Sequence, residues 1–188
     1  MINLVVFASG SGSNAENIVN YFRTHKEIRV KAFYCNNPHA FVIERAKRLK
    51  VPLRVFDSKD LASVTINKFL YEDGIDYIIL AGFLKLIPKS LIHAFPNKII
   101  NLHPALLPLY GGRGMYGSKV HEAVIANHEK KSGITIHLVN EHYDDGKILF
   151  RAETYLEPNE TPESLAEKVH ALEHKYFPLV IEQFIKGG

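Results

Sequence analysis

Hydrophobic runs alternate with amphipathic stretches through the first two-thirds of the chain. Nearly continuous runs of Val, Ile, Leu and Phe are typical of strands buried on both faces, and they occupy 2–8, 28–35, 52–56, 75–81 and 98–103. Apolar positions at helical spacing fill the intervals 13–24, 39–50, 60–72 and 88–94. This alternation predicts right-handed βαβ units, and hence an open, mostly parallel sheet with helices on both faces.

The final third of the chain has a different pattern. Residues 133–140 and 147–156 alternate apolar and polar side chains on either side of a short polar segment, which predicts an antiparallel strand pair. A long last helix is expected to start with Thr161 as its N-cap and Pro162 at its first position, and to bend or break at Pro178. The expected fold class is therefore α/β, Rossmann-like, with an antiparallel carboxyl-terminal strand pair and a terminal helix.

Composition narrows the class of protein. The 188 residues are 46% hydrophobic and 23% charged with a net charge of +3, so we expect one domain over 1–188 and no nucleic-acid partner. No apolar run approaches the ~20 residues that cross a bilayer, and the amino terminus lacks the cationic lead of a signal peptide. Cys35 is the single cysteine, which excludes an internal disulfide. We expect a cytoplasmic protein without a membrane partner.

The most informative segment is Asn101-Leu102-His103-Pro104, at the end of a predicted buried strand. On a strand, side chains spaced i, i+2 lie on one face, about 7 Å apart. An amide and an imidazole placed so can stabilise and collapse a tetrahedral adduct. The alternative is a turn with Asn101 as a cap and His103 at the surface. Asp144 precedes an Asp-Gly turn signal, and if it folds back against His103 its charge would raise the pKa of His103.

The first strand–helix junction reads Ser9-Gly10-Ser11-Gly12-Ser13-Asn14. Glycine and serine at the start of a helix leave backbone N–H groups at the positive end of its dipole, which suits an anion. Gly10-x-Gly12-x-x-Ala15 matches the dinucleotide fingerprint, but the second strand ends Cys35-Asn36-Asn37, without the carboxylate that this fingerprint requires. A phosphate monoester is therefore favoured over a dinucleotide, and a tight turn with no ligand is the alternative.

Three further segments allow alternatives. His170-Ala171-Leu172-Glu173-His174 has the spacing of a helical zinc site, with Glu182 as the available third ligand, but polar residues facing a cleft or solvent are favoured and no metal is expected. Residues 81–87 could wall a pocket for a flat aromatic ligand or simply pack as a strand end. Residues 110–117 hold four glycines and predict a mobile loop.

Taken in order, these segments resemble the folate-dependent formyltransferases, specifically the branch that formylates glycinamide ribonucleotide in purine biosynthesis. The Asn-x-His-Pro-x-Leu-Leu-Pro block at 101–108 is the specific match; the others are Ser9–Asn14, Ala81–Lys85, Gly133–Val139, Asp144–Gly146 and Glu173–His174 with Pro178. Lys85 departs from the family, where arginine is common, and the loop from Gly111 to Ser118 is longer than usual and carries Arg113. The resemblance also implies no additional domain.

The resemblance implies transfer of the formyl group of the co-substrate 10-formyltetrahydrofolate to the amine of glycinamide ribonucleotide. Asn101 and protonated His103 would stabilise the oxyanion, and Asp144 would orient His103 and relay the proton through water. The ribonucleotide would be bound by Gly12, Ser13, Asn14, His170, Ala171, Leu172 and Glu173. The folate would contact Lys59, Leu84, Lys85, Leu86, Ile87, Asn101, Asn140, Glu141, His142, Tyr143 and Asp144. Residues 1–100 would then form the nucleotide-binding half, and 101–188 the folate-binding and catalytic half.

Two other functions stay open at this point. The same scaffold could formylate an amino sugar nucleotide, or the chain could be a non-catalytic nucleotide-binding module that uses only the glycine turn. In each case the partners are small molecules, and the chain is expected to be a monomer or a homodimer.

Overall fold

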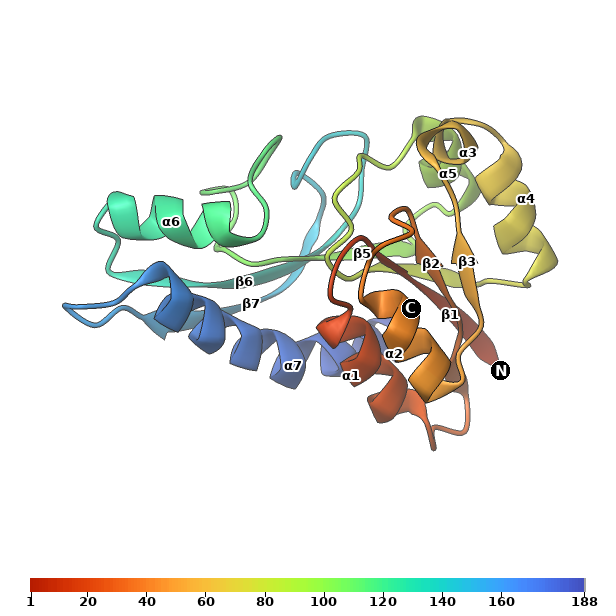
Figure 1. Ribbon diagram of the computed structural model, residues 1–188, viewed down its shortest axis with the longest axis horizontal. Coiled ribbons are helices and arrows are strands. Elements are labelled where there is room, and N and C mark those ends of the chain that lie inside the picture. Colours follow the sequence, from red (N-terminus) through yellow and green to blue (C-terminus); the bar gives the residue numbers. More distant parts are fainter. Residues whose placement is uncertain (188) are drawn as a thin grey trace. The chain divides into compact units, whose positions relative to one another are not determined.

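The computed structural model describes residues 1–187 and divides into two compact units, Met1–Asn101 and Leu102–Gly188 (Figure 1). The elements of the first unit are β1 (Ile2–Ala8), α1 (Ser13–Phe22), β2 (Ile28–Cys35), α2 (Val42–Leu49), β3 (Leu53–Val55), α3 (Ser58–Ala62), α4 (Thr65–Glu72), β4 (Tyr77–Leu80), α5 (Lys89–Ala94) and β5 (Ile99–His103), the last two residues of which belong to the second unit. These strands pair in the order β3-β2-β1-β4-β5, and every pair is parallel.

The core of the first unit explains the long apolar runs in the sequence. Leu4, Val5, Val6 and Phe7 of β1 are completely buried, as a central strand covered on both faces requires. The Phe7 ring stacks on Tyr34 of β2 and meets the edge of Phe83, which lies beyond β4. This packing fixes the carboxyl ends of β1, β2 and β4, where the candidate site residues of this unit follow.

The second unit contains α6 (Ser118–Ala126), β6 (Lys131–Leu138), β7 (Ile148–Tyr155) and α7 (Pro162–Gly187). β6 and β7 pair antiparallel from Lys131↔Tyr155 to His137↔Ile148, with a register shift between Ile136 and His137. The long helix α7 packs on β6, β7 and α6 (Figure 1). The parallel sheet, the antiparallel strand pair and the long terminal helix confirm the predicted α/β fold class.

Three details of the sequence prediction were wrong or incomplete. The helix expected over 60–72 is two helices, because Asp57 forms a capping box with Asp60 that starts α3 early, and Ser63 is extended. Of the bend or break expected at Pro178, the break does not occur, since α7 continues to Gly187 with Phe177, Val180 and Ile181 buried. Helix α6 was not predicted at all.

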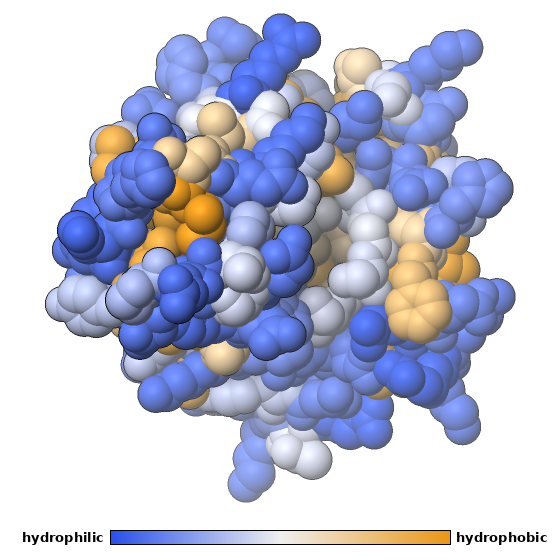
Figure 2. Space-filling view, turned by 60° about the vertical axis from the view of Figure 1, so that its left-hand side comes forward, coloured by the Kyte–Doolittle hydropathy of each residue, from blue (hydrophilic) through white to orange (hydrophobic). Residues whose placement is uncertain are grey.

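The start of α7 agrees with the prediction. Thr161 and Ser164 cap it reciprocally: the Ser164 N–H donates to Thr161 Oγ1, and the Thr161 N–H donates to Ser164 Oγ. The face shown in Figure 2 is mostly hydrophilic with small, separate apolar patches. Within residues 1–187, none of the helices is both long enough and apolar enough to traverse a bilayer.

Candidate active site

The turn between β1 and α1 is held by hydrogen bonds to its carbonyl oxygens. The Ser9 carbonyl accepts from Asn37 Nδ2, Gly10 from the Val42 N–H, Ser11 from Arg45 Nε, and Gly12 from the Glu16 N–H. In a planar trans peptide the N–H points opposite to the C=O. The N–H group of the residue after each carbonyl therefore points away from the hydrogen bond that the carbonyl accepts. These N–H groups lie at the amino-terminal, positive end of the α1 dipole.

Gly12 gives the turn its shape. It is the N-cap of α1 with φ 74° and ψ 22°, in the left-handed region, and no side chain caps the helix. A Cβ atom at this position would lie 2.4 Å from Val42 Cγ2, so α2 also requires glycine here. The amides of Ser13 and Asn14 continue the turn into the first residues of α1. The arrangement suits a phosphate, as the glycine and serine pattern indicated.

Ser9 joins this turn to the segment after β4. Its hydroxyl donates to Asn36 Oδ1 over 2.6 Å and accepts from the Leu84 N–H over 3.0 Å, while its own N–H donates to the Gly82 carbonyl. Leu84, Lys85 and Leu86 are exposed and Ile87 is buried. Two exposed leucines beside the turn can contact an apolar ligand. Lys59 is exposed on α3.

β5 carries Asn101 and His103, and the two residues lie on the same face of the strand. Asn101 is partly exposed and its backbone pairs with Leu80 of β4, whereas His103 is buried. Pro104 follows the strand, as expected. The surface alternative for His103 is wrong, because the side chain is only 5% exposed.

In the second unit Asp144 does fold back against His103. Asp144 Oδ2 lies 3.6 Å from His103 Nδ1 and accepts the Gly112 N–H over 2.8 Å, and Asp144 Oδ1 lies 3.6 Å from His137 Nε2. The other ring nitrogen of His103, Nε2, lies 2.7 Å from the Tyr110 carbonyl oxygen. One partly buried carboxylate thus faces two buried imidazoles.

The pKa of His103 moves in the direction opposite to the one expected from sequence. Burial lowers the pKa of His103 below its usual value, and His137 lowers it further; Asp144 and the Tyr110 carbonyl oppose this shift without cancelling it. Burial alone would raise the pKa of Asp144, but His137, His103 and the Gly112 N–H outweigh burial and lower it. Asp144 is therefore ionised at neutral pH.

Local backbone geometry places Asp144 in the cluster. Asp144 itself has φ 53°, a left-handed conformation that aspartate tolerates better than most residues. Gly111 packs so closely that a Cβ there would lie 3.2 Å from Asp144 Cβ. Buried Thr135 of β6 holds the segment between β5 and Gly111. The Thr135 hydroxyl donates to the Ala105 carbonyl and accepts from the Leu107 N–H.

The remaining predicted residues of this unit lie on two segments. Asn140, Glu141, His142 and Tyr143 precede Asp144 in the β6–β7 connection, where Asn140 Oδ1 accepts the His142 N–H and Tyr143 is 41% exposed. His170, Ala171, Leu172 and Glu173 lie on α7, and the His170 ring is 4.0 Å from that of His174 between centroids. Among residues 1–187, no three His, Cys, Asp or Glu side chains form a group that could hold a metal ion.

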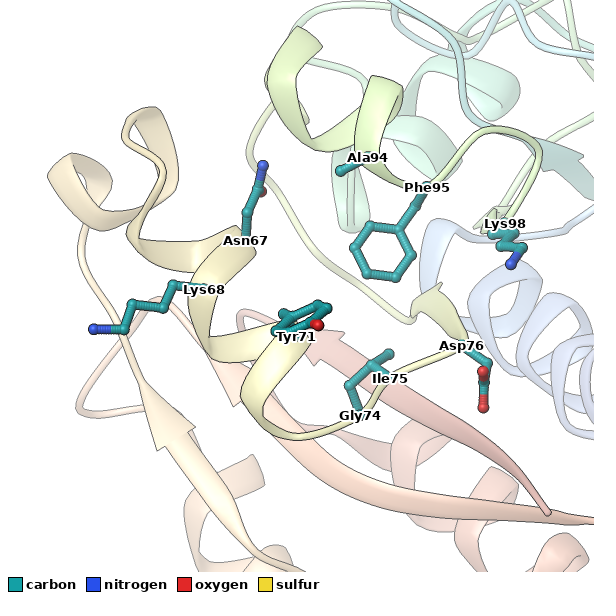
Figure 3. Close-up of a pocket in the computed structure, with 9 residues that line it drawn as sticks. All are labelled: Asn67, Lys68, Tyr71, Gly74, Ile75, Asp76, Ala94, Phe95 and Lys98. Carbon is teal, nitrogen blue, oxygen red and sulfur yellow. The ribbon is translucent and has the colours of Figure 1, made fainter.

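A pocket of about 620 Å³ lies elsewhere in the first unit, between α4 and α5 (Figure 3). Tyr71 and Phe95 line it with Lys68 and Lys98, and its Gly74–Asp76 segment leads into the amino end of β4. Ligands of open parallel sheets bind at the carboxyl ends of the strands. None of the predicted site residues lines this pocket, so it is distinct from the candidate active site.

Four contributors to the site were not identified from the sequence: His137, His121, and the backbones of Tyr110 and Gly112. His121 of α6 is buried, and burial together with the nearby His103 lowers its pKa. His137 carried a signal that could have been used, because Thr135 and His137 repeat on β6 the i, i+2 polar spacing of Asn101 and His103. Backbone groups give no such signal.

The family model described as "Formyl transferase" matches residues 2–181. This chain belongs to the formyl transferase family. It is 35% identical to phosphoribosylglycinamide formyltransferase of Bacillus subtilis, with 98% of this chain and 95% of that protein covered. It is 40% identical to the chloroplastic enzyme of that name from Arabidopsis thaliana over 95% of this chain, and spans only 63% of the plant protein.

Solved structures show the same fold. The crystal structure of glycinamide ribonucleotide transformylase 1 from Geobacillus kaustophilus superposes with a TM-score of 0.88 at 36% identity, covering 98% of each chain. The enzyme of that name from Symbiobacterium toebii gives 0.90 at 30% identity, covering 100% of this chain and 89% of that one.

Proposed function

We propose that this chain transfers the formyl group of 10-formyltetrahydrofolate to the amine of glycinamide ribonucleotide, in purine biosynthesis. The observation that carries the proposal is the 3.6 Å contact between Asp144 Oδ2 and the buried His103, which lies on the same strand as Asn101. Family membership and the names of the relatives that cover most of this chain support the same substrates.

In the proposed mechanism the substrate amine attacks the formyl carbon. A C–N bond forms to the amine, the bond from that carbon to N10 of the folate breaks, and one proton passes from the amine to N10. The Asn101 amide and the protonated ring of His103 donate to the oxygen as it becomes negative, a type of interaction worth about 3–4 kcal/mol. Asp144 holds His103 in orientation and passes the proton through water.

The binding residues are proposed in two groups. The amides of Gly12, Ser13 and Asn14 bind the phosphate of the ribonucleotide, and His170, Ala171, Leu172 and Glu173 contribute to binding its ribose. Leu84 to Ile87 and Asn140 to Tyr143 bind the folate, whose flat ring suits the exposed leucines, with Lys59 near its acidic tail. The co-substrate is the only cofactor proposed, and a monomer or homodimer in the cytoplasm is the proposed form.

An acceptor panel tests the proposal. The purified chain is mixed with 10-formyltetrahydrofolate and either glycinamide ribonucleotide or an amino sugar nucleotide. Release of tetrahydrofolate is followed by absorbance, and the formylated product is identified by mass. We expect turnover with the ribonucleotide only. Turnover with the amino sugar nucleotide alone would reassign the acceptor, and phosphate binding without any folate affinity would leave only a nucleotide-binding module.

A further inference from the structure

Arg45 of α2 reaches back to the turn between β1 and α1. Its Nε donates to the Ser11 carbonyl over 2.8 Å, a short distance of the kind that charged donors make. The Arg45 side chain is only 21% exposed, so this hydrogen bond is largely shielded from water. A charged side chain of one helix thus bonds to the backbone just before the start of another.

The Ser11 carbonyl and the Gly12 N–H belong to the same peptide unit. Because that unit is planar and trans, the two groups point in opposite directions. Glycine adopts φ of either sign at little cost, so this unit could rotate and exchange the directions of its N–H and its carbonyl. The hydrogen bond from Arg45 favours the observed orientation, in which Gly12 has φ 74°. Arg45 therefore directs the Gly12 N–H from the opposite side of the peptide.

The Arg45 guanidinium is itself held by two neighbours. Its Nη1 pairs with Oε2 of Glu16, in the first turn of α1, and its central carbon lies 5.1 Å from the centroid of the Phe41 ring. The Glu16 side chain is also only 21% exposed. A guanidinium presents its donors in a fixed planar fork, so Arg45 bonds to Glu16 and to the Ser11 carbonyl at the same time. These contacts fix the guanidinium beside the turn.

Arg48 provides a matched comparison within the same helix. It lies three residues after Arg45 on α2, and its Nη2 pairs with Oε1, the other carboxylate oxygen of Glu16. Its side chain is 60% exposed. Both arginines therefore pair with the same carboxylate, but the hydrogen bond to the Ser11 carbonyl comes from Arg45. A difference between variants of these two residues reports that hydrogen bond.

We propose that Arg45 is a positioning residue for phosphate binding, because it orients the Ser11–Gly12 peptide so that the Gly12 N–H faces the ligand. This inference rests on the proposed function, in which the turn binds the phosphate of the ribonucleotide. The charged donor also polarises the peptide unit, which strengthens the hydrogen bond that the N–H donates. Arg45 acts on the phosphate through this peptide, since its own bond lies on the carbonyl side.

Steady-state kinetics tests the effect on substrate binding. Arg45→Met removes the donor and keeps a long side chain beside Phe41, and Arg48→Met is the control. We expect Arg45→Met to raise KM for the ribonucleotide about tenfold and to change kcat by less than about twofold. Arg48→Met should leave both constants within about twofold. Equal increases in KM in the two variants would assign the effect to the lost pairing with Glu16 and overturn the proposal.

A substrate without the phosphate separates positioning of the peptide from a general distortion of the site. The value of kcat/KM is measured for glycinamide ribonucleotide and for the corresponding ribonucleoside. Arg45→Met should lower this value about tenfold for the ribonucleotide and by less than about twofold for the ribonucleoside. Equal losses with the two substrates would show a structural role for Arg45, and would refute the inference.

Binding of ribose 5-phosphate gives a readout that needs no catalysis. The Gly12 amide resonance is followed by NMR as this ligand is added to the wild-type chain and to both methionine variants. We expect the resonance to shift in all three chains, with an affinity about tenfold weaker in Arg45→Met only. An unchanged affinity in Arg45→Met, or a Gly12 resonance that does not shift in the wild type, refutes the inference. The expected weakening in a chain that does not formylate glycinamide ribonucleotide would refute the proposed function only.

Melting temperatures show whether the variants fold. If Arg45→Met does not fold, Arg45→Lys takes its place in all three measurements. Lysine keeps a positive charge beside Glu16, but one ammonium group does not reproduce the fork that reaches both acceptors. We therefore expect weaker phosphate binding in Arg45→Lys as well, and an affinity equal to that of the wild type would overturn the proposal.

Discussion

The turn after β1 and the cluster around Asp144 are built in different ways. In the turn, four successive carbonyls accept hydrogen bonds, and the backbone amides are the groups proposed to bind phosphate. Around Asp144, side chains from β5, β6 and the β6–β7 connection meet, with one backbone N–H from Gly112. The turn should therefore be sensitive to changes in backbone conformation, and the cluster to changes in side-chain chemistry.

The largest effect is expected in the cluster. His103→Ala removes the acid and Asp144→Asn removes the charge that orients it, so each should lower kcat by roughly a thousandfold. KM for the ribonucleotide should change little, because the turn proposed to bind its phosphate is untouched. Steady-state kinetics with circular dichroism melting checks this prediction. Near-normal turnover in a folded variant of either kind would remove the residue from the mechanism.

A backbone change in the turn should act on binding instead. Gly12→Ala places a Cβ 2.4 Å from Val42 Cγ2 at a left-handed residue, so we expect a loss of about 1–3 kcal/mol of stability. KM for the ribonucleotide should rise about tenfold as the amides move. Gly10→Ala is the matched control, since no atom outside its two chain neighbours lies within 4 Å of its added Cβ. Equal losses in the two variants would contradict the role given to Gly12.

A third substitution tests whether the backbone also matters in the cluster. Gly111→Ala brings a Cβ to 2.5 Å from Leu107 Cδ2 and 3.2 Å from Asp144 Cβ. The leucine side chain can move, so we expect a loss in kcat of roughly tenfold or less, with KM for the ribonucleotide unchanged. A change in KM alone would show that this loop serves binding rather than the orientation of Asp144.

The smallest effect concerns stability and pH. The folded pKa of His103 lies below its unfolded value, so its contribution is present above the unfolded pKa and is lost as pH falls through the folded pKa. The lowered pKa of Asp144 acts in the same direction at more acidic pH. Urea unfolding at pH 7.5, 6 and 5 should show falling stability. His103→Gln should flatten the part of the decline that begins near the unfolded pKa of histidine and continues below it.

The sequence was a good guide where structure is local. The apolar runs located β1, β2 and β5 within a residue or two, and the glycine and serine pattern located the turn at the start of α1. The single helix predicted over 60–72 was wrong because the capping box at Asp57 starts a separate short helix, α3. That helix has five residues, too few to show a helical period of apolar side chains. Packing of α7 outweighed the single hydrogen bond that Pro178 cannot make.

The cluster could be predicted only in part. Asp144 was identified because its turn needs one aspartate and two are present, but His137 was missed although it shares the spacing of Asn101 and His103. The direction of the His103 pKa was wrong, because the depth of burial depends on residues distant in sequence, and burial outweighs the carboxylate. Tyr110 and Gly112 act through a backbone carbonyl and a backbone N–H, which the side chains in the sequence do not reveal.

The carbonyl of Tyr110 touches the ring nitrogen that the proposed reaction would direct at a formyl oxygen. The Tyr110 carbonyl thus occupies the position that the formyl oxygen would take in the proposed reaction. It accepts the hydrogen bond of His103 Nε2 when no substrate is bound. When the formyl group binds, His103 exchanges a hydrogen bond to one neutral carbonyl for a hydrogen bond to another. This exchange contributes little free energy to binding of the substrate. The hydrogen bond becomes stronger when the formyl oxygen acquires negative charge in the transition state. The Tyr110 carbonyl stays neutral and gives no such stabilisation.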